Sequence, residues 1–374
     1  MIKRVCFSLL LTVAPCVHGA TSALGIESAI SGFISGTIFS DPDFYESTAK
    51  GGLNIDLSKG SYYFHTQIAS SVEFPTEGLV GRMTVEKVFS VAKDQEMSII
   101  IGRYPRLFSF FNSITDAVGT SQLAMLPLSQ YKRRYIIDSR MISGDGAMIN
   151  YRFHDDDYSL EFTADVNQMS RANSCLIHQE FYNKPCNNLG YGYVSEKITD
   201  SPNFDFGLQF DTKTWRVLLA LTHLNIKAEL KNPKDPLAYD TYMKANYWSH
   251  RLYKLGFIKS IDDFWIQTEA TIRDIEKGEK GKELEGYNVQ LGGYLIGGYH
   301  FTQDINGYLG YSVIRSKNGA RFDLDDRFVG ATYASGDGLT YSLEYHNGQG
   351  KDWNRYMSPD DSWSSAVMSV TWQF

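Results

Sequence analysis

Residues 158–167 read YSLEFTADVN, a run in which apolar and polar side chains alternate without interruption. The polar run His-Asp-Asp-Asp at 154–157 precedes it and has the composition of a turn. A helix would repeat its apolar residues every three or four positions, whereas a period of two indicates an extended strand. The segment therefore predicts a β-strand with one apolar face and one polar face.

The same period of two recurs along the chain. Residues 53–57 and 62–68 show it on either side of a turn at 58–60, and residues 264–272 and 339–346 show it again. Sixteen segments are predicted as strands on this basis: 26–40, 49–58, 61–72, 79–92, 96–104, 138–153, 158–167, 203–211, 215–227, 249–259, 264–275, 286–301, 305–315, 326–334, 339–347 and 362–374.

The connections between these segments alternate in length. Tight turns are predicted at 58–60, 93–95, 154–157, 212–214, 260–263, 302–304 and 335–338, and the connections between them are longer. Short turns at one end and long loops at the other are typical of bacterial outer-membrane barrels. We therefore predict an all-β fold, a 16-stranded antiparallel transmembrane β-barrel with short periplasmic turns and long extracellular loops. A soluble β-sandwich would also alternate, but it would bury its apolar faces and would not sort its loops by length.

The N-terminal residues have the pattern of a secretory signal peptide. Lys3 and Arg4 precede an apolar run at 5–17, and small residues follow at 19–23. We predict a signal peptide at 1–20, with cleavage between 19 and 23, and a barrel formed by residues 24–374. One alternative is a membrane anchor, but the run is shorter than the roughly 20 residues that span a bilayer as a helix. The other is lipoprotein processing at Cys16, which the preceding Val-Ala-Pro fits poorly.

Composition and charge exclude two classes of protein. With 43% hydrophobic residues among 374, the chain can bury a large core and is not intrinsically disordered. Its formal net charge of −7, more negative still without Lys3 and Arg4, argues against nucleic acid as a partner. Loss of a signal peptide would leave Cys175 and Cys186 as the cysteines of an exported protein. Both lie in the polar segment 168–202, so we predict a local disulfide in preference to a metal site or a free thiol.

The chain ends on a strand pattern, because the apolar face of residues 366–374 runs through to Phe374, the last residue. A terminal aromatic residue on such a strand resembles the signal read by the outer-membrane assembly machinery, which we therefore expect as a partner. It also places Trp372 and Phe374 in an aromatic girdle at the periplasmic end. The alternative is a soluble edge strand that happens to end in Phe.

Sixteen strands, a signal peptide and a terminal Phe make the whole chain resemble the porins of the Gram-negative outer membrane. Residues 101–108, IGRYPRLF, with Asn112, Asp116 and Pro127, resemble the segment leading into the third loop of phosphate-selective and dicarboxylate-channel porins. The resemblance implies that residues 104–137 fold into the lumen as a constriction loop and that the protein forms a homotrimer in the outer membrane. It also implies passive diffusion of small polar solutes.

Charged side chains are the candidate functional residues, because a water-filled barrel selects solutes by its bore and by the charges that line it. Basic residues cluster on both arms of the 104–137 loop and on the strand that follows. The predicted pore-lining set is Arg103, Arg106, Asp116, Lys132, Arg133, Arg134, Arg140, Arg152, Glu161 and Glu269. Further inward carboxylates are predicted at Asp165, Asp205 and Glu344. We expect a weak anion preference; the alternative places residues 132–134 at the outer rim, against lipopolysaccharide phosphates or water.

Two other classes of function stay open on the sequence. A barrel hydrolase would need a nucleophile, a histidine and a carboxylate within reach; the chain has neither HExxH nor GxSxG, although His65, His250 or His346 could pair with a serine across strands. A surface-binding protein would contact a host or phage through the long loops, and that role is compatible with a pore. We expect no enzymatic activity, no cofactor and no metal, and we interpret the acidic runs at 155–157 and 323–326 as solvated turns.

Overall fold

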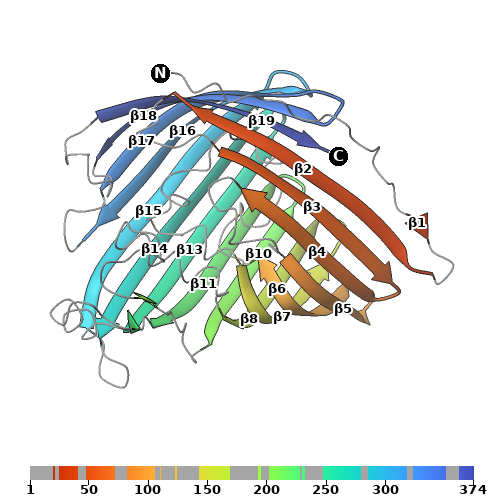
Figure 1. The fold of residues 1–374 in the computed structure, drawn as a ribbon. Helices are drawn as coiled ribbons and strands as arrows, with labels where there is room; N and C mark the ends of the chain where they lie inside the picture. The colour runs from red at the N-terminus through yellow and green to blue at the C-terminus, as the bar shows by residue number, and fades with distance from the viewer. Residues whose placement is uncertain are drawn as a thin grey trace.

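The computed structural model describes residues 20–21, 25–40, 48–71, 82–105, 110, 123, 143–168, 193–194, 202–227, 230–231, 247–278, 285–317, 323–350 and 362–374. The regular elements in this part of the chain are all β-strands. No helix long and apolar enough to cross a membrane is found among these residues. The long strands lie side by side in one curved sheet (Figure 1).

Sixteen long strands form this sheet. In chain order they are β2 (Glu27–Phe39), β3 (Thr48–Lys59), β4 (Tyr62–Ser71), β5 (Arg82–Ala92), β6 (Gln95–Pro105), β7 (Ser143–His154), β8 (Tyr158–Gln168), β10 (Asn203–Thr212), β11 (Trp215–Lys227), β13 (Tyr247–Ile261), β14 (Phe264–Gly278), β15 (Glu285–His300), β16 (Ile305–Ser316), β17 (Leu324–Ala334), β18 (Leu339–Gly350) and β19 (Ser362–Gln373). Two-residue strands complete the set: β1 (Ala20–Thr21) pairs with β2, and β9 (Tyr193–Val194) pairs with β12 (Leu230–Lys231).

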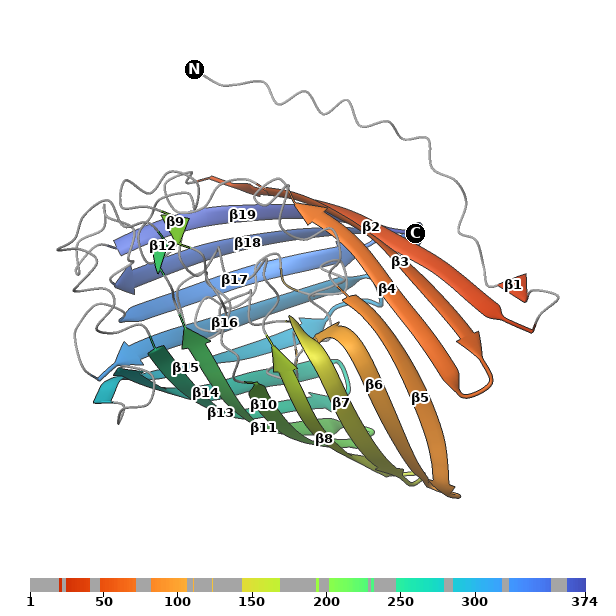
Figure 2. The ribbon, with the colours of Figure 1, turned by 60° about the horizontal axis from the view of Figure 1, so that its bottom comes forward.

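The sheet closes on itself. Each long strand pairs antiparallel with the next one along the chain, and β19 then pairs antiparallel with β2, from Val367 opposite Phe39 to Gln373 opposite Phe33. Figure 2 shows the strands following one another around the ring. The fold is the predicted closed 16-stranded antiparallel barrel, which leaves no open sheet edge whose backbone groups would lack partners in hydrocarbon.

Side-chain exposure shows that the apolar face of this barrel points outward. Leu309 and Leu343 expose 68% and 59% of their surface, whereas the polar residues Ser312 and Glu344 on the opposite face of the same strands are buried. A soluble sandwich would reverse this arrangement, with its apolar faces packed together. The exposed apolar band therefore suits contact with lipid and not with water.

Aromatic side chains collect on the outer face at the end of the barrel that carries the tight turns. The rings of Phe153, Tyr158, Phe210 and Trp215 form a continuous run with centroids 5.7, 5.6 and 4.9 Å apart. Further contacts at this end are Phe264–Tyr299, Tyr299–Phe301, Tyr333–Tyr341 and Trp372–Phe374. Such a girdle is typical of a membrane–water interface. Trp372 and Phe374 belong to this end, where the sequence pattern had placed them.

The opposite end carries ion pairs on the outer face. Arg103 bonds to Asp145 at 2.7 Å and Arg251 to Glu276 at 3.0 Å, close to the ends of their strands. Arg315 and Asp325 pair in the same way at 2.8 Å. The outer wall is thus aromatic at one rim, apolar in the middle and charged at the other rim, in agreement with a membrane-spanning orientation.

Predicted and observed strands agree to within a few residues, and the differences have local causes. β13 and β14 run on to a two-residue turn, which they accommodate because Asp262 adopts a positive φ of 51°. β18 continues to Gly350 because Gln349 pairs with Asp325 of β17.

The acidic run at 155–157 is an exposed turn, as predicted, but the run at 323–326 is not. Leu324 starts β17, and Asp326 is buried against His346, so that interpretation was wrong.

The last residue takes part in closing the barrel. The Gly32 N–H donates to the Phe374 carbonyl at 2.8 Å, and the Phe374 N–H donates to the Gly32 carbonyl at 3.0 Å. A Cβ at position 32 would lie 2.5 Å from the Phe374 ring, so glycine is needed for this close approach. Phe374, at the C-terminal end of β19, therefore contacts β2 through both its backbone and its ring.

Deleting Phe374 should weaken barrel closure, because it removes this pair of backbone hydrogen bonds at a cost of roughly 1–3 kcal/mol. We expect the truncated chain to refold in detergent with lower yield and to unfold at a lower temperature. Heat-dependent gel mobility measures the temperature at which each barrel unfolds. Phe374→Tyr keeps the ring and both bonds and should behave as wild type. Equal unfolding temperatures for the truncated and full-length chains would contradict this role.

Candidate functional site

The inner wall of the barrel is polar, because the residues that alternate with the exposed apolar band carry hydrogen-bonding side chains. Buried members of this inner face are Gln67, Thr84, Ser98, Thr163, Thr222, Gln290, Ser312, Thr332, Ser342 and Ser369. They come from strands all around the ring. A polar interior inside an apolar exterior is what a water-filled passage requires.

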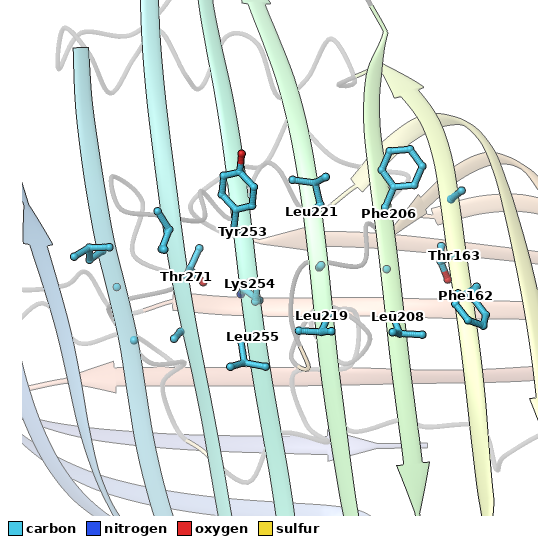
Figure 3. Close-up of a pocket in the computed structure, with 18 of the residues that line it drawn as sticks. Phe162, Thr163, Phe206, Leu208, Leu219, Leu221, Tyr253, Lys254, Leu255 and Thr271 are labelled. Carbon is cyan, nitrogen blue, oxygen red and sulfur yellow. The ribbon is translucent and has the colours of Figure 1, made fainter. Parts of the chain in front are cut away.

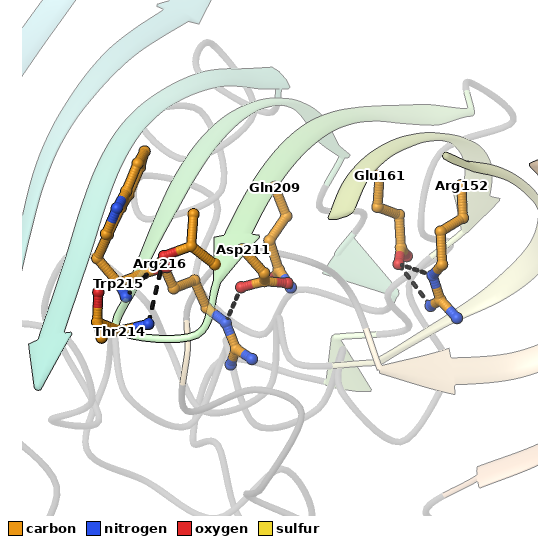
Figure 4. Close-up of polar contacts among 8 residues, drawn as sticks. Arg152, Glu161, Gln209, Asp211, Thr214, Trp215 and Arg216 are labelled. Atoms are coloured by element: carbon orange, nitrogen blue, oxygen red, sulfur yellow. Dashed lines mark hydrogen bonds and ion pairs between the residues drawn. The ribbon is translucent and has the colours of Figure 1, made fainter. Parts of the chain in front are cut away.

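Ion pairs stand on the inner wall near the tight-turn end. Arg152 of β7 donates to Glu161 of β8, with a closest contact of 2.5 Å, and the arginine is half exposed. On the next strands Arg216 pairs with Asp211, which also accepts a hydrogen bond from Gln209 at 2.7 Å. Figure 4 shows the two ion pairs lying along the same stretch of wall. These guanidinium groups are accessible, so they can act on a passing solute.

A buried acidic cluster lies further along β8 and β10. The side-chain amide of Asn167 contacts both Asp165 and Asp205, the second at 3.0 Å. Asp165 and Asp205 face each other in register across the two strands. Both had been predicted to point inward, and both are buried on this inner face.

A second buried cluster spans β17 and β18. The His346 ring lies between two carboxylates, with Nδ1 3.0 Å from Asp326 and Nε2 2.9 Å from Glu344. The Tyr308 hydroxyl donates to the other oxygen of Glu344 at 2.7 Å, and Phe328 stacks on the imidazole. Each carboxylate therefore has a partner within the wall, which holds the cluster in place.

The third cluster connects the wall to the segment between β6 and β7. Glu269 of β14 receives a hydrogen bond from the Lys254 ammonium at 3.0 Å and another, through its other oxygen, from the Phe110 backbone N–H at 2.7 Å. Both charged side chains are almost fully buried. The Phe110 ring packs over Gly256, where a Cβ would approach it to 2.6 Å. Phe110 follows β6 in the chain but contacts the inner face of β13 and β14. Strands β7, β8, β10 and β11 separate β6 from β13 in the sheet.

Leu123, the other described residue of this segment, makes a matching apolar contact. It belongs to a buried cluster with the inward-facing side chains Trp265, Tyr294, Ile296, Tyr308 and Phe328 of β14 to β17. Those strands lie across the ring from β6. The two described residues between β6 and β7 are therefore both inside the barrel and against its far wall.

The predicted pore-lining residues fall into three groups. Arg152, Glu161 and Glu269 lie on the inner face. Arg103 lies on the outer face, since it is in register with the exposed Met83 and alternates with the buried Tyr104. The remaining residues lie outside the described part of the chain: Arg106, Asp116, Lys132, Arg133, Arg134 and Arg140, together with the predicted disulfide partners Cys175 and Cys186.

Several inner-wall residues were not among the predicted site residues. Lys254, Arg273 and Asp326 all face inward at positions that the period of two identifies. Lys254 and Arg273 have the parity of the inward positions on β13 and β14, and Asp326 lies in the acidic run at 323–326 that was predicted to be a turn. Carboxylates outnumber basic groups on the described inner wall. The carboxylates are Glu27, Asp56, Glu86, Glu96, Glu161, Asp165, Asp205, Asp211, Glu269, Asp326 and Glu344, and the basic groups are Arg82, Arg152, Arg216, Lys254 and Arg273.

The three histidines considered for a hydrolase have other partners. His65 contacts Asp56 at 2.6 Å, His250 contacts Arg273 at 2.6 Å, and His346 contacts the two carboxylates described above. Among the described contacts none of these rings bonds to a serine hydroxyl. Nor do the described residues contain a group of three or more His, Cys, Asp or Glu side chains suited to hold a metal ion.

Comparison with known proteins shows the fold class. No family model matches the chain, and no curated protein matches it in sequence. Among solved structures, it is similar to OmpF of Salmonella typhi in complex with daunomycin, at 14% identity and a TM-score of 0.58 over 94% of this chain and 98% of that one. It is also similar to an anion-selective porin from Comamonas acidovorans, at 10% identity and a TM-score of 0.56 over 93% and 100% of the two chains. A third similar structure is the trimer form of OmpT from Vibrio cholerae, at 11% identity and a TM-score of 0.53 over 93% and 99%.

These similarities define the chain as a porin-like 16-stranded barrel of the type found in Gram-negative outer membranes. At this level of identity they establish the architecture. They do not select the phosphate-selective subfamily that residues 101–108 resemble.

Glu269→Leu should destabilise the barrel by roughly 3–5 kcal/mol, because it removes the carboxylate that pairs with the buried Lys254 ammonium at 3.0 Å. Adding Lys254→Leu should recover most of that loss, since no uncompensated charge then remains. Urea unfolding of the protein in lipid vesicles measures both values. As a matched control, Glu161→Leu should cost about 1 kcal/mol or less, because its partner Arg152 is half exposed to water. A double variant as unstable as Glu269→Leu alone would contradict this account.

Proposed function

We propose that this protein is an outer-membrane porin that allows passive diffusion of small hydrophilic solutes. The observation that carries the proposal is a closed 16-stranded barrel whose outer face is apolar and whose inner face is polar all around the ring. A barrel of this strand number is wide enough to leave an aqueous channel. Diffusion through it needs no catalytic chemistry, only a bore and an electrostatic barrier.

We further propose that the segment 104–137 narrows the channel as a constriction loop. The contacts of Phe110 with Glu269 and Gly256, and of Leu123 with the cluster on β14 to β17, support this role. Both described residues of this segment lie inside the barrel against its far wall, which supports a smaller cross-section open to solutes.

The proposed selectivity depends on charge of opposite sign across this interior. The described wall is rich in carboxylates, whereas the loop segment and the strand that follows supply the basic residues Arg106, Lys132, Arg133, Arg134 and Arg140. Charges facing each other across a lumen produce a transverse field that orients dipolar solutes while net selectivity stays small. We propose a weak anion preference set by the basic side.

Three further features complete the proposal: export by the signal peptide, insertion through the terminal strand by the assembly machinery, and a homotrimer surrounded by outer-membrane lipid and lipopolysaccharide. The trimer form of the similar OmpT structure supports the oligomeric state by analogy of fold. The rim of outward ion pairs and the aromatic girdle support the orientation in the membrane.

In a planar bilayer, the detergent-extracted protein should insert in discrete conductance steps, frequently in groups of three. Under a salt gradient, the sign of the reversal potential should indicate a slight excess of anion permeability, because the loop arginines would set the barrier at the narrowest point. The porin function would be contradicted if the protein gave no conductance steps while its heat-dependent gel mobility showed that it was folded.

Arg106→Gln combined with Arg133→Gln should shift selectivity toward cations, lowering the anion-to-cation permeability ratio roughly twofold or more, because lumen charges set that ratio. Arg103→Gln is the matched control: Arg103 faces outward with Asp145, so its loss should leave the ratio unchanged. Reversal potentials of wild type, the double variant and Arg103→Gln under the same salt gradient give the three permeability ratios to compare. An unchanged ratio in the double variant would place Arg106 and Arg133 outside the conduction path.

A further inference from the structure

Two inward aromatic rings on neighbouring strands lie against the wall, each over a glycine of the other strand. In the ladder between β16 and β17, Tyr308 faces Gly330 and Phe328 faces Gly310. A Cβ at position 330 would approach the Tyr308 ring to 2.6 Å, and a Cβ at position 310 would approach the Phe328 ring more closely still. Both rings are buried. Together Tyr308 and Phe328 form an apolar surface on the inner wall, the aromatic platform.

A buried triad of charged side chains, Asp326, His346 and Glu344, contacts the aromatic platform from β17 and β18. The Tyr308 hydroxyl donates to Glu344 at 2.7 Å, and the Phe328 ring stacks on the His346 imidazole with ring centroids 5.1 Å apart. His346 lies between its two carboxylates, with Nδ1 3.0 Å from Asp326 and Nε2 2.9 Å from Glu344. Each ring of the platform is therefore fixed by one member of the triad.

The geometry of the triad favours a protonated imidazole. A carboxylate accepts hydrogen bonds, and a neutral imidazole has one N–H, so a neutral ring could donate to only one of its two partners. An imidazolium donates to both. Among the described residues that face the triad from neighbouring strands, Tyr308 is the other titratable group, and Ser312, Ser365 and Val367 are uncharged. Replacing His346 by a neutral residue would therefore remove the cation that lies between two buried carboxylates.

Leu123 lies on the aromatic platform. Its side chain is 5% exposed and belongs to one buried apolar cluster with Trp265, Tyr294, Ile296, Tyr308 and Phe328. The two platform rings thus contact the triad on one side and the Leu123 cluster on the other. The position of Leu123 depends on whether these rings stay against the wall.

The bond at Phe110 lies elsewhere on the wall. The Phe110 N–H donates to Glu269 of β14, which pairs with Lys254 of β13. Figure 3 shows Lys254 on its strand between Tyr253 and Leu255, whose side chains point to the outer face. The triad is on β17 and β18, and β15 and β16 separate these strands from β14. A change in the triad should therefore act on the aromatic platform without removing the bond at Phe110.

We propose that His346 is a positioning residue for the passage of solutes: acting through the aromatic platform, it keeps Leu123 against the wall. A buried ionic contact is lost at high cost when one partner is removed, so the platform rings keep their places only while the triad is complete. Because Leu123 already lies against the wall, movement off the platform would carry it into the bore. The inference rests on the proposed constriction loop and adds the residues that set its position.

The reactivity of a thiol at position 123 tests this proposal in the detergent-solubilised protein. Leu123→Cys is labelled with a maleimide, and peptide mass spectrometry separates this thiol from Cys175 and Cys186. The buried thiol should react slowly. Adding His346→Gln should raise its labelling rate about tenfold or more, because the cation between the two carboxylates is lost.

Neutralising the two carboxylates should reverse that effect. With Asp326→Asn and Glu344→Gln added to His346→Gln, the labelling rate should return close to the starting value, because amides keep hydrogen-bonding groups at the three positions without their charges. Loss of packing alone would not be rescued by two further substitutions. Tyr308→Phe is the milder second variant, should His346→Gln fold poorly. It removes only the hydroxyl that bonds to Glu344 and should raise the rate about threefold.

His65→Gln is the matched control. His65 also has a carboxylate beside each ring nitrogen, Asp56 at 2.6 Å and Glu86 at 3.8 Å, but it lies on β4 and outside the Leu123 cluster. Its loss should leave labelling at position 123 unchanged.

The proposal would be overturned by a labelling rate that neither His346→Gln nor Tyr308→Phe raises, or by a triple variant as reactive as His346→Gln alone. Single-channel conductance of the same proteins keeps this outcome apart from the porin function. Where wild type conducts, His346→Gln should lower the conductance, because Leu123 then enters the bore. Wild type without conductance would end the porin proposal, while the labelling rates would still decide whether His346 positions Leu123.

Discussion

Closure of the backbone hydrogen-bond ladder is the constraint on which the rest of this structure depends. A strand in hydrocarbon has no water to satisfy its N–H and C=O groups, so an open edge is excluded. The pairing of β19 with β2 meets that requirement with the last residues of the chain, including Phe374 against Gly32. The ring closes through β2 and β19, so Phe374 takes part in the hydrogen-bond ladder that completes it. The close contact at Gly32 leaves no room for a side chain there.

Closure together with the pleat divides the residues of every strand between two different surroundings. Successive side chains point to opposite faces, so the apolar face meets lipid and the polar face meets the interior. The interior face then has to compensate the charges that become buried. His346 lies between Asp326 and Glu344, and Lys254 pairs with Glu269. A buried charge without such partners would cost several kcal/mol, which explains why the buried charges occur in cross-strand sets.

The period of two predicted the strand number, the faces and most strand boundaries from the sequence, because these depend only on local alternation and on turn composition. It predicted Glu161 and Glu269 as inward residues for the same reason. It could have indicated Lys254 and Arg273 as well, since they share parity with Glu269 across the register of β13 and β14. Arg103 shows the limit: a basic residue next to a loop was assigned to the lumen by its proximity to other arginines, whereas its parity with Met83 places it outside. The contact of Phe110 with Glu269 joins residues 159 positions apart, and no local pattern contains such information.

Alternation also makes the two faces of the barrel chemically independent. Glu269 and Ala270 are neighbours in the chain, yet one bonds to Phe110 inside the barrel and the other lies exposed on the outer face. A change of side chain at Ala270 alters the outer face while the backbone that carries Glu269 stays in its ladder. Conversely, the inner charges can be exchanged without touching the lipid face. A single strand can therefore present a polar surface to the interior and an apolar surface to the outside, because the pleat keeps their side chains apart and the closed ladder keeps both in register.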